Sequence, residues 1–208
     1  MIDVSKVEVM GIEGAIRGMR NPKNSWSLSD SDGEFLGEND MRLCTRLSRA
    51  GTEHRKFMRM IHVQMDVVAP LYWWKEFDTY KVGTVSNSCS TMHKLASKPI
   101  TLKDFSIDDF EGEFKGGNLS LSDCFENVVA DCEMYRQKYL ETEDKRYWKA
   151  MIQLLPCSYN QRRTIDFNYE VALNILHQRQ SHKLDEWRKF CDELLKLPYM
   201  LEFKEADS

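Results

Sequence analysis

The chain has 208 residues, of which 42% are hydrophobic and 30% are charged, an ordinary composition for a folded globular protein. Its 29 basic and 33 acidic residues give a net charge of −4, which argues against a general nucleic-acid-binding protein, because such proteins usually carry a basic excess. No apolar run approaches the roughly 18 residues of a membrane span, and the first residues mix acids with apolar side chains, unlike a signal peptide. We therefore expect a single domain over 1–208 in the cytoplasm, without membrane or nucleic-acid partners.

The cysteines and histidines show no metal-ligand spacing. The six cysteines form no CxxC pair, and the five histidines form no HExxH motif. We expect reduced, mostly buried thiols, as in proteins of a reducing compartment. We also expect no metal site.

In the first part of the chain, alternation and turn residues predict short elements. A strand is expected over 6–10, followed by a small helix over 11–18. Asn, Ser, Asp and Gly dominate 21–37, which predicts a loop. A helix is expected over 40–50, with Asn39 as its N-cap.

The clearest strand comes next, because apolar side chains occupy alternate positions of 61–67. Pro70 suits the first turn of an aromatic-rich helix. Ser, Asn and Thr crowd 83–90, so a loop is expected there, and 97–117 is irregular.

The C-terminal half is predicted to be mainly helical. A long helix begins after Ser120 or Ser122, either of which can serve as its N-cap, and a second helix is expected over 143–154. A short strand over 164–169 leads into a helix that ends near Arg179.

A last helix is expected between Ser181, its N-cap, and Pro198. Separate helices with a few strands that do not alternate regularly with them predict an α+β fold rather than β-α-β winding.

Three groups of polar residues are candidates for chemistry. The first is Glu53-His54-Arg55-Lys56, directly before the clear strand. The second is the segment 78–93, which holds hydroxyls, an amide, a thiol and a lysine. These groups suit phosphate or carbonyl oxygens, although an ordinary solvated loop has the same composition.

The third group lies near the C-terminal helices and contains Asn168, Asn174, Arg179 and His182. An Asn and an Arg on an otherwise apolar face cost free energy unless they have partners. A ligand could supply the partners, and a capping Asn with a solvated Arg is the alternative.

These regions, in this order, resemble the flavin-dependent thymidylate synthase family from about Asn39 to about Trp187. Leu47-Ser48-Arg49-Ala50-Gly51 followed by His54 looks like the family's helix-to-histidine turn, and Ala69-Pro70 looks like the start of its aromatic helix. The family signature R-H-R-x2-S-x-N-E-x-S-x-R then aligns without a gap. Its positions are occupied here by Thr79, Tyr80, Lys81, Thr84, Ser86, Asn87, Cys89 and Thr91.

The C-terminal match is the more specific one. After Leu155-Pro156, the chain reproduces the family's N-x5-N-x4-R spacing with Asn168, Asn174 and Arg179. His182 and Trp187 fall within one residue of a family histidine and tryptophan.

The resemblance implies an α+β fold with an antiparallel sheet and several packed helices, assembled as a homotetramer with FAD at the subunit interfaces. It also implies an enzyme of nucleotide biosynthesis that reductively methylates dUMP, or a related pyrimidine nucleotide, to form dTMP, with methylenetetrahydrofolate and NADPH as co-substrates. Lys81 and Arg179 would be the catalytic residues. The substrate-binding residues would be Lys81, Asn87, Cys89, Ser90, Thr91 and Arg179. The cofactor-binding residues would be His54, Thr79, Tyr80, Lys81, Asn168, Asn174 and His182.

The signature also departs from the family pattern. Thr79 and Thr91 replace two arginines, and Lys81 replaces a third. Lysine keeps the charge but loses the planar fork that grips an oxyanion at two points. The alternative function is therefore a catalytically silent homologue that binds flavin or nucleotide.

Overall fold

The computed structural model describes residues 1–33, 35–108, 110, 115–116 and 119–206. The chain forms two compact units. One consists of Met1–Asp3, Val68–Phe77 and Ser88–Arg163, and the other of Val4–Val67, Asp78–Asn87 and Thr164–Ser208. The expectation of one domain over 1–208 stays a prediction.

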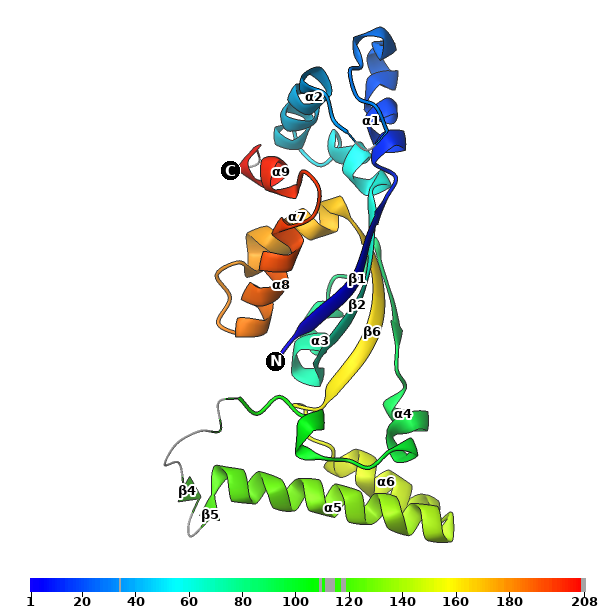
Figure 1. The fold of residues 1–208 in the computed structure, drawn as a ribbon, viewed down its shortest axis with the longest axis vertical. Coiled ribbons are helices and arrows are strands. Elements are labelled where there is room, and N and C mark those ends of the chain that lie inside the picture. The colour runs from blue at the N-terminus through cyan, green and yellow to red at the C-terminus, as the bar shows by residue number, and fades with distance from the viewer. Residues whose placement is uncertain (34, 109, 111–114, 117–118, 207–208) are drawn as a thin grey trace. The chain divides into compact units, whose positions relative to one another are not determined.

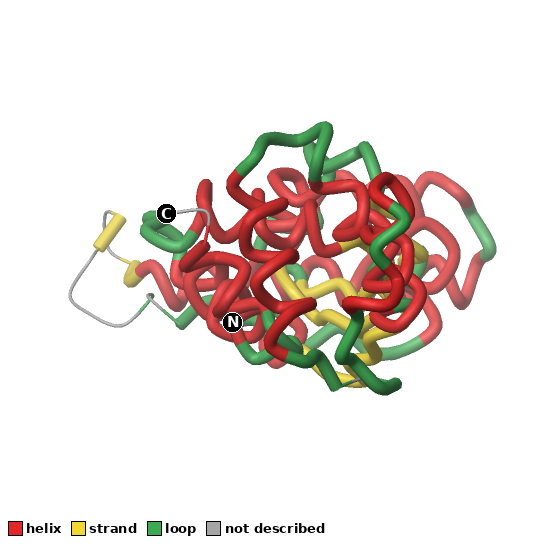
Figure 2. The backbone as a smooth tube through the Cα atoms, turned by 90° about the horizontal axis from the view of Figure 1, so that it is seen from above, coloured by secondary structure: helices red, strands yellow, loops and turns green. Residues whose placement is uncertain are grey.

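A four-stranded antiparallel sheet runs in the order β1, β2, β6, β3 (Figure 1). Its strands are β1 (Asp3–Met10), β2 (His62–Pro70), β6 (Asn160–Asn168) and β3 (Thr84–Ser88). Helices, red in Figure 2, make up far more of the described chain than the yellow strands. This architecture confirms the α+β prediction with an antiparallel sheet.

Strand β2 shows the burial pattern that its sequence predicts. Ile61, Val63, Met65 and Val67 are buried, whereas His62 and Gln64 between them are exposed. Pro70 is the last residue of β2 rather than the first turn of a helix, and α3 (Leu71–Phe77) starts directly after it.

The prediction of a loop over 83–90 is wrong, because β3 occupies most of that segment. β3 is an edge strand with β6 as its single neighbour in the sheet, and four of its five residues are exposed. A solvated edge strand needs no buried alternate positions, so its sequence lacks the period of two. β6 also begins earlier than the predicted short strand, at Asn160.

In the unit that contains Ser88–Arg163, α5 (Leu121–Thr142) and α6 (Lys145–Leu154) pack against each other. Ser120 is the N-cap of α5, and it exchanges two hydrogen bonds of 3.1 Å with Asp123. Shorter elements of the same region are α4 (Thr91–Lys94), β4 (Lys115–Gly116) and β5 (Leu119–Ser120).

The other unit is mainly helical. Its helices are α1 (Ile12–Arg20), α2 (Glu38–Arg49), α7 (Tyr169–Arg179), α8 (Asp185–Leu195) and α9 (Met200–Ala206), with a 3-10 helix at Arg55–Met60. Two predicted caps are wrong: Gly37, not Asn39, precedes α2, and Leu184, not Ser181, precedes α8. The chain also continues into α9 after Pro198.

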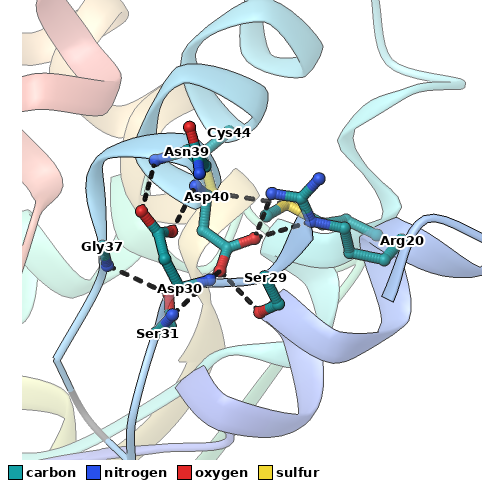
Figure 3. Close-up of polar contacts among 9 residues, drawn as sticks. Arg20, Ser29, Asp30, Ser31, Gly37, Asn39, Asp40 and Cys44 are labelled. Carbon is teal, nitrogen blue, oxygen red and sulfur yellow. Dashed lines mark hydrogen bonds and ion pairs between the residues drawn. The ribbon is translucent and has the colours of Figure 1, made fainter. Parts of the chain in front are cut away.

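The polar segment between α1 and α2 is held by a buried carboxylate, Asp40, with its partners Arg20, Ser29, Asp30 and Ser31; we call this set the Asp40 network (Figure 3). Arg20 lies 2.7 Å from Asp40 Oδ1 as an ion pair, and both side chains are almost fully buried. The Ser29 and Ser31 hydroxyls each donate a 2.7 Å hydrogen bond to Asp40 Oδ2. Burial alone would raise the pKa of Asp40, but hydrogen bonds from Ser29, Ser31 and Arg20 outweigh burial and lower it.

Candidate functional site

Five side chains come together from the end of α7, the start of α8 and the segment before β3. We call Tyr80, Gln178, Arg179, His182 and Trp187 the Tyr80–Arg179 cluster. Arg179 Nε donates a 3.0 Å hydrogen bond to the Tyr80 hydroxyl, which donates in turn to Gln178 Oε1 at 2.9 Å. The cluster therefore joins residues 99 positions apart in the chain through one phenol.

Arg179 is the central cation of the cluster. Its guanidinium carbon lies 4.8 Å from the centroid of the Trp187 ring and 5.8 Å from that of Tyr80. Trp187 is fully buried and Arg179 is half-buried, so the contact has the geometry of a cation–π interaction in a partly dry site. Arg179 is also the last residue of α7, where the helix dipole favours a positive charge.

His182 lies beside the Trp187 ring of the cluster. Its ring centroid is 6.3 Å from that of Trp187, and its Nδ1 accepts a 3.2 Å hydrogen bond from the backbone N–H of Leu184. An accepting Nδ1 places the proton of the neutral ring on Nε2. His182 therefore presents an N–H donor on its other nitrogen.

Asn168 and Gly83 fix the segment that carries Tyr80. Asn168 is 8% exposed, and its Oδ1 accepts a 3.0 Å hydrogen bond from the N–H of Val171, so it is the N-cap of α7. Gly83 has a φ of +75°, and a Cβ atom there would lie 2.6 Å from Asn168 Nδ2. Glycine is required at this turn by both its φ and the close amide.

The other residues predicted to bind the cofactor differ in their surroundings. Thr79, Lys81 and Asn174 are exposed. No side-chain ion pair or hydrogen bond of Lys81 is found within the described part of the chain. His54 is exposed, its Nε2 lies 3.7 Å from Glu53 Oε1, and it has no contact with the cluster among the described residues.

The predicted substrate segment 87–91 contains residues of both compact units. Asn87 is exposed on β3 and belongs to the unit that contains the cluster, whereas Cys89, Ser90 and Thr91 belong to the other. Cys89 has an exposed thiol, and its backbone is held by the Arg162 carbonyl at 2.9 Å and by the Gln161 amide at 2.8 Å.

Ser90 and Thr91 continue this segment into α4. The Ser90 hydroxyl accepts a 3.1 Å hydrogen bond from the N–H of His93 and caps that helix, and Thr91 is half-buried at its first position. Their predicted contacts with a nucleotide stay predictions.

A cavity of about 930 Å³ lies in the unit that contains α1 and α2; we call it the α1–α2 cavity. Its lining includes Lys23, Arg46 and Lys56 together with the predicted residue His54. Sequence reasoning singled out the segment 53–56 but missed Lys23 and Arg46 in the cavity and Gln178 in the cluster, and it matched Trp187 to a family tryptophan without giving it a role in the site. Basic and apolar residues on neighbouring turns of α2 were the available signal for the cavity, and the aromatic residue near Arg179 was the signal for the cluster.

Two further observations concern metals and membranes. Within the described ranges, no group of three or more His, Cys, Asp or Glu side chains could hold a metal ion. Across those same residues, no helix has both the length and the apolar character needed to cross a membrane.

Comparison with known proteins identifies the fold. No protein-family model and no curated protein matches the chain. Its structure is similar to thymidylate synthase X (ThyX) from Helicobacter pylori, crystallised with FAD and dUMP. The TM-score is 0.70, the sequence identity is 16%, and the match covers 100% of both chains.

A second similar structure is the UMP/dUMP methylase PolB from Streptomyces cacaoi bound with 5-Br dUMP. Its TM-score is 0.64 at 14% identity, over 99% of this chain and 93% of that one. The chain therefore has the fold of the flavin-dependent thymidylate synthases, as the sequence resemblance implies. At these identities the similarity establishes the fold, and an activity has to be argued from the site.

Proposed function

We propose that this chain is a divergent flavin-dependent thymidylate synthase that methylates dUMP, or a related pyrimidine nucleotide. The observation that carries the proposal is the Tyr80–Arg179 cluster, a half-buried arginine fixed between aromatic rings. It occurs in the fold of two proteins that were crystallised with dUMP or its bromo analogue. A fixed cation in a partly dry site suits an anionic nucleotide.

Arg179 and Lys81 would bind and polarise the nucleotide. A guanidinium has five N–H donors, so the hydrogen bond from Arg179 to Tyr80 is compatible with a pyrimidine oxygen or a phosphate as a further acceptor. Lys81 follows Tyr80 directly and is exposed, so its ammonium can reach a phosphate. Asn87, Cys89, Ser90 and Thr91 would line the nucleotide site, as the resemblance implies.

The chemistry of the residues present fits a flavin. His182 offers an N–H donor beside the Trp187 ring, and Tyr80 offers an aromatic face; such groups suit a planar heterocycle that carries phosphates. Thr79, Lys81, Asn174 and His54 would complete the set, while Asn168 would act mainly by holding the Gly83 turn.

Bound FAD would supply the redox chemistry, with NADPH as reductant and methylenetetrahydrofolate as the carbon source. The chain's own residues would bind, orient and exclude water.

We also propose that the protein is a cytoplasmic homotetramer, since the resemblance places flavin at subunit interfaces. Analytical ultracentrifugation is expected to show an assembly of four chains. A monomer of 24.5 kDa at micromolar concentration would contradict a shared site.

The second candidate is a flavin- or nucleotide-binding protein without turnover. Thr79 and Thr91 at two signature arginine positions favour it, because a neutral hydroxyl cannot replace a guanidinium at an oxyanion.

Binding and turnover test the two candidates separately. The purified protein is expected to show flavin absorbance after addition of FAD and to bind dUMP in calorimetry. Arg179→Gln is expected to weaken dUMP binding by about 2 kcal/mol, or roughly thirtyfold, because a charge-assisted hydrogen bond is lost.

Lys189→Gln, an exposed charge on α8, is the matched control. An unchanged dUMP affinity in Arg179→Gln, or no affinity in the wild type, would contradict both candidates as nucleotide-binding proteins.

A further inference from the structure

Cys157 and Lys75 form a thiol–amine pair, and neither residue belongs to the set proposed to bind nucleotide or flavin. Lys75 Nζ donates a 3.1 Å hydrogen bond to Cys157 Sγ, although the two residues are 82 positions apart in the chain. Both side chains are exposed, and both residues belong to one compact unit. A small oxidant in solution can therefore reach the sulfur, and an amine already lies beside it.

Two hydrogen bonds hold α3, the helix that carries Lys75, against the chain around Cys157. The backbone N–H of Tyr72 donates to the Cys157 carbonyl at 3.0 Å. The indole Nε1 of Trp74 donates to the Gln161 carbonyl at 2.9 Å. Because these bonds fix the backbone on both sides of the pair, the sulfur and the nitrogen are held at reacting distance in the folded chain.

The buried face of α3 fixes the side on which Lys75 lies. Trp73, Trp74 and Phe77 are buried, and the rings of Trp73 and Phe77 stack with their centroids 5.2 Å apart. A short helix anchored by three aromatic side chains cannot turn about its axis without exposing them. Lys75 therefore stays on the exposed side of α3, beside Cys157.

The pair combines a nucleophile with a proton donor. The thiolate form of cysteine is the species that attacks oxidants. An ammonium at hydrogen-bond distance can give a proton to the group that leaves, and it then becomes a neutral amine. Cys89 is exposed as well, but its thiol accepts no hydrogen bond from a lysine within the described part of the chain. Cys157 is thus the exposed thiol with an amine in place.

We propose that Cys157 and Lys75 form a reversible covalent modification site that reacts with hydrogen peroxide. The Cys157 thiolate attacks one peroxide oxygen and the O–O bond breaks. The leaving hydroxide takes a proton from the Lys75 ammonium and becomes water. The neutral amine then attacks the sulfur of the sulfenic acid, so that an S–N bond forms and the S–O bond breaks. The hydroxyl leaves with one amine proton as a second water.

The product is a sulfenamide link between α3 and the segment before β6. The sulfur has lost two electrons and the peroxide has gained them. A thiol reductant reverses the link by attacking the sulfur, which releases the amine, and a second thiol resolves the mixed disulfide. Because sulfinic and sulfonic acids are not reversed by thiols, the link protects Cys157 from irreversible oxidation. The proposal does not depend on the proposed function.

Peptide mass spectrometry after peroxide treatment tests this modification. In folded wild-type protein, we expect peptides joined through Cys157 and Lys75, with a mass lower than their sum by two hydrogen atoms. Dithiothreitol is expected to restore the separate peptides. Peroxide added to urea-unfolded protein is expected to give no such link, because the amine is then no longer held beside the sulfur.

Lys75→Arg separates the covalent role of the amine from its charge. Arginine keeps a cation that can donate to sulfur, but a guanidinium stays protonated and cannot attack the sulfenic acid. The link is expected to disappear, and the Cys157 sulfenic acid is expected to accumulate and to be trapped by dimedone. Lys149→Arg changes an exposed lysine on α6 in the same compact unit, and this matched control should form the link as the wild type does.

Two results would overturn the proposal. The first is folded wild-type protein in which peroxide leaves Cys157 unmodified, or converts it to an acid without any link to Lys75. The second is a Cys157 cross-link of unchanged yield in Lys75→Arg, because another amine would then be the partner.

Discussion

Asp40→Asn is the substitution with the most clearly defined energetic consequence. Asparagine keeps the shape of the side chain but removes the charge that balances the buried Arg20. The asparagine side chain also has one acceptor oxygen where the carboxylate has two, so its NH2 group must face either Arg20 or the donors of Ser29 and Ser31. The substitution therefore leaves either the buried Arg20 or the partly buried donors of Ser29 and Ser31 without an acceptor.

The size of the effect follows from the burial of the pair. Breaking a buried ion pair on one side costs roughly 3–5 kcal/mol, because the remaining charge stays buried without compensation. For a chain of this length, each kcal/mol lowers the melting temperature by roughly 2–4 °C. We therefore expect Asp40→Asn to lower the melting temperature by roughly 10 °C at neutral pH.

The effect also has a defined pH dependence. Because the pKa of Asp40 is lowered in the folded protein, its contribution to stability is complete above the unfolded carboxyl pKa of about 3.9. The contribution is lost as the pH falls through the lower pKa of the folded state. The difference in melting temperature between wild type and Asp40→Asn should therefore shrink as the pH is lowered below about 4.

Differential scanning calorimetry at neutral and acidic pH measures this effect. Asp32→Asn, an exposed carboxylate of the same segment, is the control and is expected to leave the melting temperature unchanged. Equal melting temperatures for Asp40→Asn and wild type at neutral pH would refute the reasoning. A difference that persists unchanged in acid would also refute it.

Three further predictions concern the described fold. Gly83→Ala should cost about 2 kcal/mol of unfolding free energy in urea denaturation, because it strains the turn and displaces a capping amide, whereas Gly33→Ala, with open space around its positive φ, should cost less. Ser120→Ala should cost about 1 kcal/mol, and an equal loss in Ser122→Ala would argue against the capping box. In Ellman's assay at about pH 8, exposed thiols should react before unfolding, whereas burial raises the pKa of Cys44 and Cys191 to about 12 and that of Cys132 to about 11. The thiols expected to react rapidly are the exposed Cys89 and Cys157. Rapid labelling of the three buried thiols in the folded protein would contradict their burial.

The elements that the sequence predicts well are those with one buried face. Strand β2 alternates because one side of it is buried, and that alternation is visible in its residues. Strand β3 lies at a sheet edge and is solvated, so it has no such pattern. The predicted N-cap of α2 is wrong for another reason. The Asp30 carboxylate, which lies outside the helix, accepts hydrogen bonds from the first-turn N–H groups of Asn39 and Asp40, so Asn39 is not needed as a cap.

In the candidate site, too, some features could be predicted from the sequence and others could not. The resemblance identified Tyr80, Arg179 and His182, which the fold brings together around Trp187. No spacing rule links residues so distant in the chain, and the resemblance supplied that information. The α1–α2 cavity could not be predicted, because its wall depends on the Asp40 network, whose partners converge only in the folded chain.

Formation of dTMP tests the proposed function most directly. The protein is incubated with dUMP, FAD, NADPH and isotopically labelled methylenetetrahydrofolate, and the nucleotides are analysed by mass spectrometry. We expect labelled dTMP that requires every component, with turnover reduced at least about thirtyfold in Arg179→Gln and unchanged in Lys189→Gln. Absence of labelled dTMP from wild-type protein that binds both FAD and dUMP would contradict the proposed activity and establish the chain as a binding protein without turnover.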